Sequence, residues 1–430
     1  MLRNNTKPLA NPQNDETSVV TEGDIDDSHM SGKSLISIVK RYDENKWIVA
    51  FKRIWPIYFA VHLAALVLDW LSTLFKLKDY DYSTVLFHSL WENWYQWDTQ
   101  HYTGIAIGGY TKIEDTAFFP LYPLLIRIVK FVFPIHNQTT AALLAALLVA
   151  NVAGLVMLVV FYQLVREDFD DDCAYRTVLY FSIFPTALFF IAGYTESLFV
   201  CLLLLSFYCM RRGYWWLSGL FGLFACLTRS GGVFLLLPFC YEYLRQQQFQ
   251  LKKIRFSVLA GVLIPMGVAL FSFYCYWRFG DFLSFSHVQA TTWFRETTSP
   301  WTTFNLMFIQ MQHDNSPLNY HFVRNAVDLV PDILVLIVLI LSVVGPWRFH
   351  HAQYSYCILA ISLFIFLQMF PVPYAFPMQA MGRYMLEVFP AFIVLSRLGK
   401  NRTFDLNYLI VASTTFACLL MLFITGRWII

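Results

Sequence analysis

The stretch "IWPIYFAVHLAALVLDWLSTLF", residues 54–75, decides the fold because it is long and apolar enough to cross the hydrocarbon core of a bilayer as one helix. The rest of the chain has the same character: 57% of its residues are hydrophobic, only 14% are charged, and the mean hydropathy is +0.50. A soluble domain carries about a quarter charged residues. The sequence therefore predicts an all-α polytopic membrane protein with lipid as its main solvent.

About eleven transmembrane helices are predicted from the apolar runs. Several of these runs are short, so they need polar residues at their ends or must share the thickness of the membrane with other segments. Segment 118–134 is apolar too, but it contains Arg127 and Lys130. A charged side chain at bilayer depth costs about 2.5–3.5 kcal/mol, so we expect this segment to be interfacial or re-entrant. The predicted spans are 54–75, 140–163, 176–194, 197–210, 214–228, 231–244, 256–277, 327–345, 354–371, 384–397 and 407–425.

The positions of Lys and Arg predict the orientation. Several basic residues between Lys33 and Arg53 precede the first span, so the N-terminus is expected in the cytoplasm. If 118–134 does not cross, five short connections share that side. The other side then holds two large exterior loops, 76–139 with its interfacial helices and 279–325. The short connections carry eleven basic residues, namely Arg166, Arg211, Arg212, Arg245, Lys252, Lys253, Arg255, Arg348, Arg397, Lys400 and Arg402.

The remaining composition excludes several classes of protein. Residues 1–32 are polar and aperiodic, so we expect a disordered cytoplasmic tail, followed by a single membrane domain over 33–430. The net charge of +2 gives no basic surface for nucleic acid. None of the eight cysteines is in a CxxC pair and most lie in apolar runs, so they are expected to be small buried hydrophobic residues.

Five polar motifs fall on the predicted exterior side, whereas the cytoplasmic connections hold mostly simple charge. This distribution predicts that the functional site lies on the non-cytoplasmic face of the membrane. The motifs are "WDTQH" (97–101), "FFPLYP" (118–123), "GYTES" (193–197), "TRSGG" (228–232) and "QAMGRY" (379–384).

In the first motif, Asp98 follows Trp97 and precedes His101 by three residues, which puts Asp98 and His101 on one face of a helix. A carboxylate among aromatic rings at a membrane surface can act as a general base. A helix cap or an interfacial ion pair explains the same pattern equally well.

The other motifs supply one acid and two cations. Glu196 lies between two apolar spans, where an acid is costly unless it is paired or hydrated; it can also belong to the first turn of a helix capped by Thr195. Arg229 is followed by a Ser-Gly-Gly sequence that opens the next span, and this arrangement favours an anion site over a snorkelling side chain. Arg383 also stands at the head of a span, and two arginines on one side suit a phosphate group.

The loop 279–325 is rich in Trp, Phe, His and amide side chains. This composition fits a surface that binds sugars, and it equally fits an interfacial loop with an aromatic belt. Its histidines, His287, His313 and His321, lack metal-ligand spacing, so no metal site is predicted.

These motifs resemble those of the PIG-V (GPI mannosyltransferase 2) family, within the GT-C superfamily of glycosyltransferases that use lipid-phosphate sugars. The similarity is carried by "WDTQHYTGIAIGGY", "AFFPLYP", "GYTESLF", "TRSGG" and "GRYMLEVFP", which occur in the family's order between about residues 97 and 390. Two positions differ: Thr195 stands where the family commonly has Ser, and Gly231 where it commonly has Asn.

The resemblance implies a GT-C-like bundle and an inverting transfer of mannose from a polyprenyl-phosphate-mannose donor to a hydroxyl of a glycolipid or another acceptor, as in GPI-anchor biosynthesis. It implies no metal and no cofactor. By match to the motifs, Asp98 is the base, His101 orients it or contacts the donor phosphate, and Glu196 binds sugar hydroxyls or fixes an arginine. Arg229 and Arg383 stabilise the leaving phosphate. The other residues expected to bind substrate are Trp97, Tyr122, Ser197, Ser230, Gln379 and Tyr384.

Three alternatives stay open from the sequence. A transporter or flippase for a lipid-linked or small polar substrate is the first, although no internal repeat is visible and the charged motifs gather on one side. A GT-C enzyme that transfers another sugar is the second. An accessory subunit that binds a lipid-linked sugar without catalysis is the third.

Overall fold

The structure is a computed structural model that describes residues 32–76, 88–314, 316–372 and 375–427. The chain divides into two compact units, 1–46 and 47–430, and the features below belong to the second. The predicted tail lies, apart from its last residue, outside the described residues. Its disorder and the single domain over 33–430 therefore stay predictions.

All regular elements in these ranges are helices, as the sequence predicts, and no strand occurs among the described residues. The α-helices are α1 (Gly32–Lys76), α2 (His88–Glu92), α3 (Asp98–Gly108), α4 (Leu121–Val129), α5 (Gln138–Asp168), α6 (Asp171–Ser182), α7 (Glu196–Arg211), α8 (Trp215–Thr228), α9 (Leu236–Gln246), α10 (Leu263–Phe279), α11 (Ser284–Thr291), α12 (Pro300–His313), α13 (Tyr320–Val343), α14 (Tyr354–Leu367), α15 (Met381–Tyr384), α16 (Pro390–Leu398) and α17 (Arg402–Ile424). The 3-10 helices used below are η1 (Ile113–Ala117), η3 (Ala187–Phe190), η4 (Ser230–Leu235) and η8 (Met385–Glu387).

Five of the described helical stretches are long and apolar enough to cross a membrane, which supports an integral membrane protein. They are Asn45–Ser72, Gln138–Asp168, Phe256–Phe279, Tyr320–Val343 and Arg402–Ile424. The other predicted spans correspond to shorter helices, such as α7 with 16 residues and α8 with 14. The predicted number of eleven spans is therefore not confirmed.

Two predicted spans are not continuous helices. In 176–194, α6 ends at Ser182 and η3 begins only at Ala187, because Pro185 cannot continue the hydrogen bonding of α6. In 384–397, η8 precedes a nine-residue α16. Within 118–134, α4 has nine residues, which at about 1.5 Å per residue are too few to cross the hydrocarbon core.

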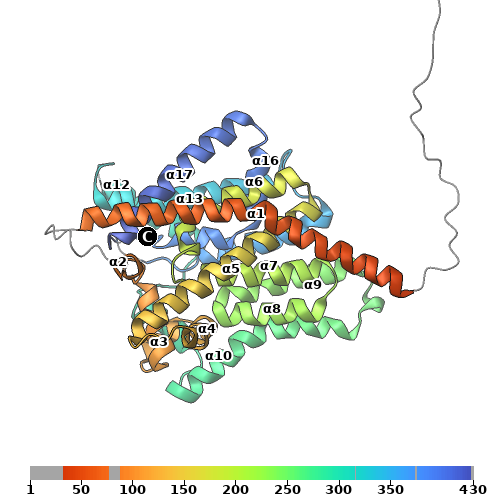
Figure 1. The fold of residues 1–430 in the computed structure, drawn as a ribbon, viewed down its shortest axis with the longest axis horizontal. Coiled ribbons are helices and arrows are strands. Elements are labelled where there is room, and N and C mark those ends of the chain that lie inside the picture. The colour runs from red at the N-terminus through yellow and green to blue at the C-terminus, as the bar shows by residue number, and fades with distance from the viewer. Residues whose placement is uncertain (1–31, 77–87, 315, 373–374, 428–430) are drawn as a thin grey trace, which may run out of the picture. The chain divides into compact units, whose positions relative to one another are not determined.

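The core lies around α5 and α7. Helix α5 packs against α6 and α7 along its length and against α3 and α4 near its start, and α7 packs against α8 (Figure 1). Every residue of α7 from Glu196 to Leu204 is buried. A helix that is apolar all round needs neighbours on every side, and α7 has them.

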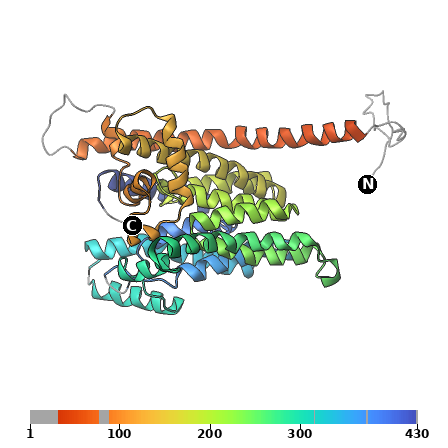
Figure 2. The same cartoon turned by 90° about the horizontal axis from the view of Figure 1, so that it is seen from below.

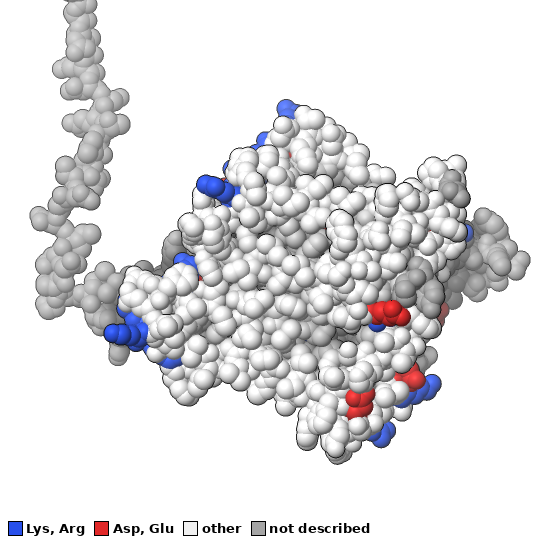
Figure 3. Space-filling view, turned by 180° about the vertical axis from the view of Figure 1, so that it is seen from behind, with Lys and Arg blue, Asp and Glu red and all other residues white. Residues whose placement is uncertain are grey.

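One end of this unit gathers the five basic connections that the sequence analysis placed on one side. We call it the basic end. In Figure 3, where most of the visible face is uncharged, Lys and Arg lie mainly along the left and upper edges. The contacts that join the connections are Arg211 Nη2 to Asp168 Oδ2 (2.8 Å), Lys400 Nζ to Asp170 Oδ2 (3.9 Å), Gln246 Nε2 to the Met210 carbonyl (2.9 Å) and Arg397 Nη1 to the Trp347 carbonyl (2.7 Å).

The opposite end gathers the polar motifs, and we call it the site end. Figure 2 shows the region of α3 and α4 (orange) and the short helices α11 and α12 (teal) both at this end, on the left of the view. The joining contacts are Arg278 Nε to the Tyr110 carbonyl (3.4 Å), Thr186 Oγ1 to the Gly382 carbonyl (2.8 Å), Thr303 Oγ1 to the Gln368 carbonyl (2.6 Å) and Asn325 Nδ2 to the Ala375 carbonyl (3.0 Å). Segments far apart in the sequence therefore build one surface.

Candidate active site

Asp98 is the first residue of α3, where a carboxylate interacts favourably with the helix N-terminus. Trp97 precedes it with a φ of 40° and packs its ring 5.1 Å from that of Phe423. The positive φ turns the chain sharply into the helix. The structure thus uses Trp97 to position Asp98.

Arg383 lies in the short helix α15 and contacts Asp98 from the far end of the sequence. Its Nη1 donates to Asp98 Oδ2 at 2.8 Å, and its Nε lies 3.0 Å from Glu196 Oε1. Among the described residues, Asp98 Oδ1 makes no hydrogen bond or ion pair with another side chain. One carboxylate oxygen is therefore held and the other is left for a ligand.

Glu196 begins α7 and joins the two arginines. The same Oε1 that contacts Arg383 also accepts from Arg229 Nη1 at 2.8 Å. Thr195 does not cap α7 with its side chain, because its hydroxyl lies 3.3 Å from the Tyr102 hydroxyl. Of the roles expected for Glu196, the geometry favours fixing an arginine.

Glu387 in η8 completes the group, with Oε1 3.0 Å from Arg229 Nη1. Asp98, Glu196, Glu387, Arg229 and Arg383 form a continuous set of ion pairs, which we call the charge cluster. Each arginine contacts two carboxylates, and Glu196 is shared between them. Such pairing offsets the cost of removing five charges from water.

The carboxylates keep both arginines charged. Burial by itself lowers the pKa of Arg383, but Glu196 and Asp98 outweigh this effect and hold that pKa well above its ordinary value. Burial likewise opposes the charge on Arg229, and Glu387 and Glu196 raise its pKa. The cluster therefore presents fixed cations.

Access differs among the members of the cluster. The side chains of Glu196 and Glu387 are 1% and 3% exposed, whereas that of Asp98 is 20% exposed. Asp98 is thus the carboxylate of the cluster that a substrate can reach without rearrangement. This difference favours Asp98 over the two glutamates as a group that exchanges a proton with a substrate.

Tyr384, one of the residues predicted to bind substrate, lies beside the cluster. Its ring centroid is 4.8 Å from the guanidinium carbon of Arg229 and 5.0 Å from that of Arg383. Its hydroxyl is 3.3 Å from Arg383 Nη2. The negative face of an aromatic ring stabilises a nearby cation.

His101 does not join the charge cluster through any recorded hydrogen bond or ion pair. Its exposed ring stacks on Phe118 with centroids 4.6 Å apart, and Trp293 lies edge-on at 6.4 Å. These three rings form an aromatic surface next to α3. Stacked rings of this kind suit the apolar face of a sugar.

For four of the residues predicted to bind substrate, the structure shows the following contacts. Tyr122 is buried and donates to the Ala146 carbonyl at 2.9 Å, and Ser197 is buried and donates to the Phe190 carbonyl at 2.7 Å. Both hydroxyls are used inside the protein. Ser230 opens η4 without a recorded side-chain partner, and Gln379 contributes its backbone carbonyl to Arg295 at 3.3 Å.

The expected anion site at Arg229 has a different form. The side chain faces carboxylates of the protein itself, and the helix that follows is a six-residue 3-10 helix. A Cβ on Gly232 would lie 2.7 Å from the backbone carbon of Ala225, so this glycine permits η4 to approach α8 closely. The glycine is required by packing between two elements of the protein.

Neither Glu387 nor Arg295 is predicted as a site residue from the sequence. Glu387 lies four residues after Arg383 in an apolar segment, and that isolated charge, like Glu196, could have identified it. Arg295 stands in a loop with other polar residues, so its position beside Tyr384 could not be read from the pattern. Within the described ranges, no three His, Cys, Asp or Glu side chains are arranged to hold a metal ion.

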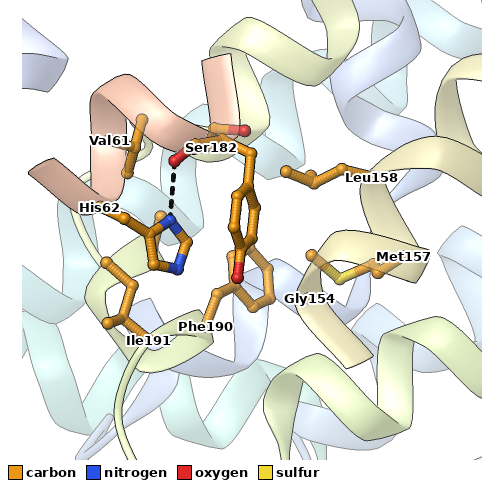
Figure 4. Close-up of a pocket in the computed structure, with 10 residues that line it drawn as sticks. Val61, His62, Gly154, Met157, Leu158, Ser182, Phe190 and Ile191 are labelled. Carbon is orange, nitrogen blue, oxygen red and sulfur yellow. Dashed lines mark hydrogen bonds between the residues drawn. The ribbon is translucent and has the colours of Figure 1, made fainter. Parts of the chain in front are cut away.

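A separate small pocket lies between α1, α5 and the chain around η3 (Figure 4). Its lining is mostly apolar, and His62 points into it while contacting the Tyr58 carbonyl at 2.8 Å and Asn151 Oδ1 at 2.7 Å. None of the predicted site residues lines this pocket. The charge cluster therefore stays the candidate active site.

The arrangement of helices is that of the GT-C class of membrane proteins, as predicted. The structure matches that of ArnT from Cupriavidus metallidurans, which was crystallised with undecaprenyl phosphate. The TM-score is 0.50 and the sequence identity 17%, over 84% of this chain and 63% of that chain. At this identity the match shows the fold alone.

The family model described as Mannosyltransferase (PIG-V) matches residues 82–363, and the chain belongs to this family. It is 29% identical over 203 residues to GPI alpha-1,6-mannosyltransferase 2 of Homo sapiens, a match that covers 43% of this chain and 40% of the relative. It is also 29% identical over 203 residues to GPI mannosyltransferase 2 of Drosophila pseudoobscura pseudoobscura, covering 42% and 44%. The match thus spans less than half the length of these relatives. The predicted family is confirmed.

Proposed function

We propose that this protein transfers a mannosyl residue from a polyprenyl-phosphate-mannose donor to a hydroxyl of a glycolipid, with inversion at the sugar carbon. Membership of the mannosyltransferase family supports the reaction class. The observation that carries the proposal is the charge cluster, in which the partly exposed Asp98 is held by Arg383 through one oxygen only. The crystallisation of ArnT with undecaprenyl phosphate makes polyprenyl phosphates the natural donor lipids to test.

In the proposed reaction Asp98 takes the proton of the acceptor hydroxyl. The hydroxyl oxygen forms a bond to C1 of the mannose, the bond from C1 to the phosphate oxygen breaks, and the lipid phosphate leaves with the electron pair. Inversion follows because attack and departure occur on opposite sides of C1. The mechanism uses no metal ion, since guanidinium groups supply the positive charge.

The buried members of the cluster prepare the site for this reaction. Arg383 fixes Asp98, while Glu196 and Glu387 hold the two arginines without contacting solvent. Positive groups that are already in place stabilise charge in the transition state without reorganising. The aromatic surface of His101, Phe118 and Trp293 is proposed to hold the sugar.

The proposal also places the active site on the non-cytoplasmic face. The site end lies opposite the basic end, and short basic connections favour the cytoplasm. The prenyl chain of the donor then stays in the lipid while its phosphate reaches the site at the membrane surface.

The test uses purified protein, labelled polyprenyl-phosphate-mannose and a panel of hydroxyl acceptors. We predict that Asp98→Asn lowers the transfer rate by about 100-fold or more, because the amide cannot take a proton, while donor binding persists. Asp172→Asn, the same change at an exposed position of α6, is the control and should behave as the wild type. Full activity of Asp98→Asn would remove the base assignment, and failure of the wild type to transfer mannose to any acceptor would contradict the proposed donor.

A further inference from the structure

One cation beside the charge cluster has no carboxylate partner among the residues that the structure describes. Arg295 lies between α11 and α12, and its Nη2 donates to the Gln379 carbonyl at 3.3 Å and to the Tyr384 hydroxyl at 3.4 Å. Both acceptors are neutral. Arg295 makes no recorded ion pair with an acidic residue in the part of the chain that the structure describes, whereas Arg229 and Arg383 each contact two.

Tyr384 connects Arg295 to the cluster. The guanidinium carbon of Arg295 lies 5.5 Å from the ring centroid, so three arginines surround one phenol. The hydroxyl of Tyr384 faces both Arg383 Nη2 and Arg295 Nη2. Arg295 is therefore the third cation of the site, and among the described residues it makes no ion pair with an acidic side chain.

The backbone holds Arg295 in this position. Its N–H donates to the Gln289 carbonyl at 2.9 Å, and Phe294 before it has a φ of 53°. Two residues earlier, Trp293 packs edge-on against Phe118 with centroids 5.8 Å apart. The segment thus contacts the aromatic surface through Trp293 and the cluster through Arg295.

We propose that Arg295 binds the phosphate of the lipid-linked donor, an inference that rests on the function proposed above. A phosphate that approaches Arg229 or Arg383 meets the carboxylates that already pair with them. The recorded contacts of Arg295 use only Nη2, and its half-buried side chain has further N–H groups to offer. A guanidinium binds phosphate through two parallel hydrogen bonds.

The position also suits an inverting transfer. The contacts run from Asp98 to Arg383, from Arg383 to the Tyr384 hydroxyl, and from that hydroxyl to Arg295, so Asp98 and Arg295 stand at the two ends of this chain of contacts. Base and leaving phosphate must stand on opposite sides of the sugar carbon. In this proposal C1 of the sugar lies between Asp98 and Arg295.

The experiment measures the affinity of the full-length protein in detergent for polyprenyl phosphate, with uncharged polyprenol as comparator. Arg295→Gln should weaken polyprenyl phosphate binding by about 10- to 100-fold, the usual loss for a hydrogen-bonded ion pair, and leave polyprenol binding unchanged. Arg295→Lys should fall between, because it keeps the charge and loses the planar fork. Arg278→Gln, an exposed arginine at the same end, is the matched control and should bind like the wild type.

The outcomes separate this inference from the proposed function. Equal affinity of the wild type and Arg295→Gln for polyprenyl phosphate overturns the inference and leaves the proposed function intact. A wild-type protein that binds polyprenyl phosphate no better than polyprenol contradicts the lipid-phosphate donor itself. If Arg295→Gln also lowers the thermal midpoint, the affinity of Arg295→Lys for polyprenyl phosphate is the deciding measurement. Wild-type affinity in a stable Lys variant shows that the positive charge alone binds the phosphate and that the planar guanidinium is not required.

Discussion

At the scale of single residues, Arg383 connects three groups of the site. Its Nη1, Nε and Nη2 face Asp98, Glu196 and Tyr384, respectively. A planar guanidinium can serve three groups in fixed directions, and a lysine ammonium cannot. The chemistry of the site therefore depends on the type of cation as well as on its charge.

Gly232 gives the first prediction at this scale. A Cβ there would lie 2.7 Å from the backbone of Ala225, whereas at Gly231 the nearest atom would be 3.7 Å away. Gly232→Ala should lower the free energy of unfolding by about 1–3 kcal/mol through overpacking, and Gly231→Ala should have little effect. Thermal unfolding of both variants in the same detergent measures the difference. Equal midpoints would show that η4 can move away from α8 without cost.

Single residues also show what the sequence could predict. A charged side chain in an apolar segment is costly unless it is paired or functional, and this argument predicts four site residues. The structure brings all four together: Asp98, Glu196, Arg229 and Arg383. The sequence does not show that the hydroxyls of Tyr122 and Ser197 donate to backbone carbonyls of neighbouring helices instead of pointing to a ligand. Hydrogen-bond partners contributed by distant backbone cannot be read from a local motif.

At the scale of elements, the four-residue helix α15 depends on its neighbours for its position. The N–H of Gly382 donates to Asp328 Oδ1 on α13 at 2.9 Å, and its carbonyl accepts from Thr186 Oγ1 at 2.8 Å. Ala380 enters the helix with a φ of 68°. Both backbone polar groups of Gly382 are thus held by side chains, directly next to Arg383.

Thr186→Val tests this support. The change keeps the shape and removes the hydroxyl, so the Gly382 carbonyl loses its partner at a cost of about 1 kcal/mol. We expect the transfer rate to fall several-fold, because Arg383 no longer holds Asp98 firmly, with only a small drop in thermal midpoint. Thr415→Val is the control, since that hydroxyl donates within its own helix, to the Val411 carbonyl. An unchanged rate for Thr186→Val would mean that Asp328 alone fixes the turn.

At the scale of the whole molecule, the basic connections gather at one end and the polar motifs at the other, while the topology in the membrane and the number of spans stay predictions. Periodicity and hydropathy identify long spans such as α5 and α13. They do not reveal that α6 ends at Ser182 and that the next helical element is the four-residue η3, because Pro185 interrupts the helix between them. Short helices buried among others carry no clear length signal.

Orientation in the membrane is tested by single cysteines. In a background with the exposed Cys240 and Cys418 changed to Ser, Lys252→Cys at the basic end should react with an impermeant thiol reagent only from the cytoplasmic side. Lys112→Cys at the site end should react only from the other side. Labelling of sealed vesicles of both orientations measures this. Reaction of both cysteines from one side would contradict the separation of the two ends by the membrane.

The sharing of one Glu196 oxygen by Arg229 and Arg383 has a consequence for how this protein evolves. Loss of Arg229 removes the ion-pair partner of the buried Glu387, and loss of Arg383 removes that of Asp98, so either single replacement is penalised. Lineages should therefore keep or exchange these five positions as a set. A homologue that has replaced Arg229 should carry a matching replacement at Glu387, whose Oε1 lies 3.0 Å from Arg229 Nη1.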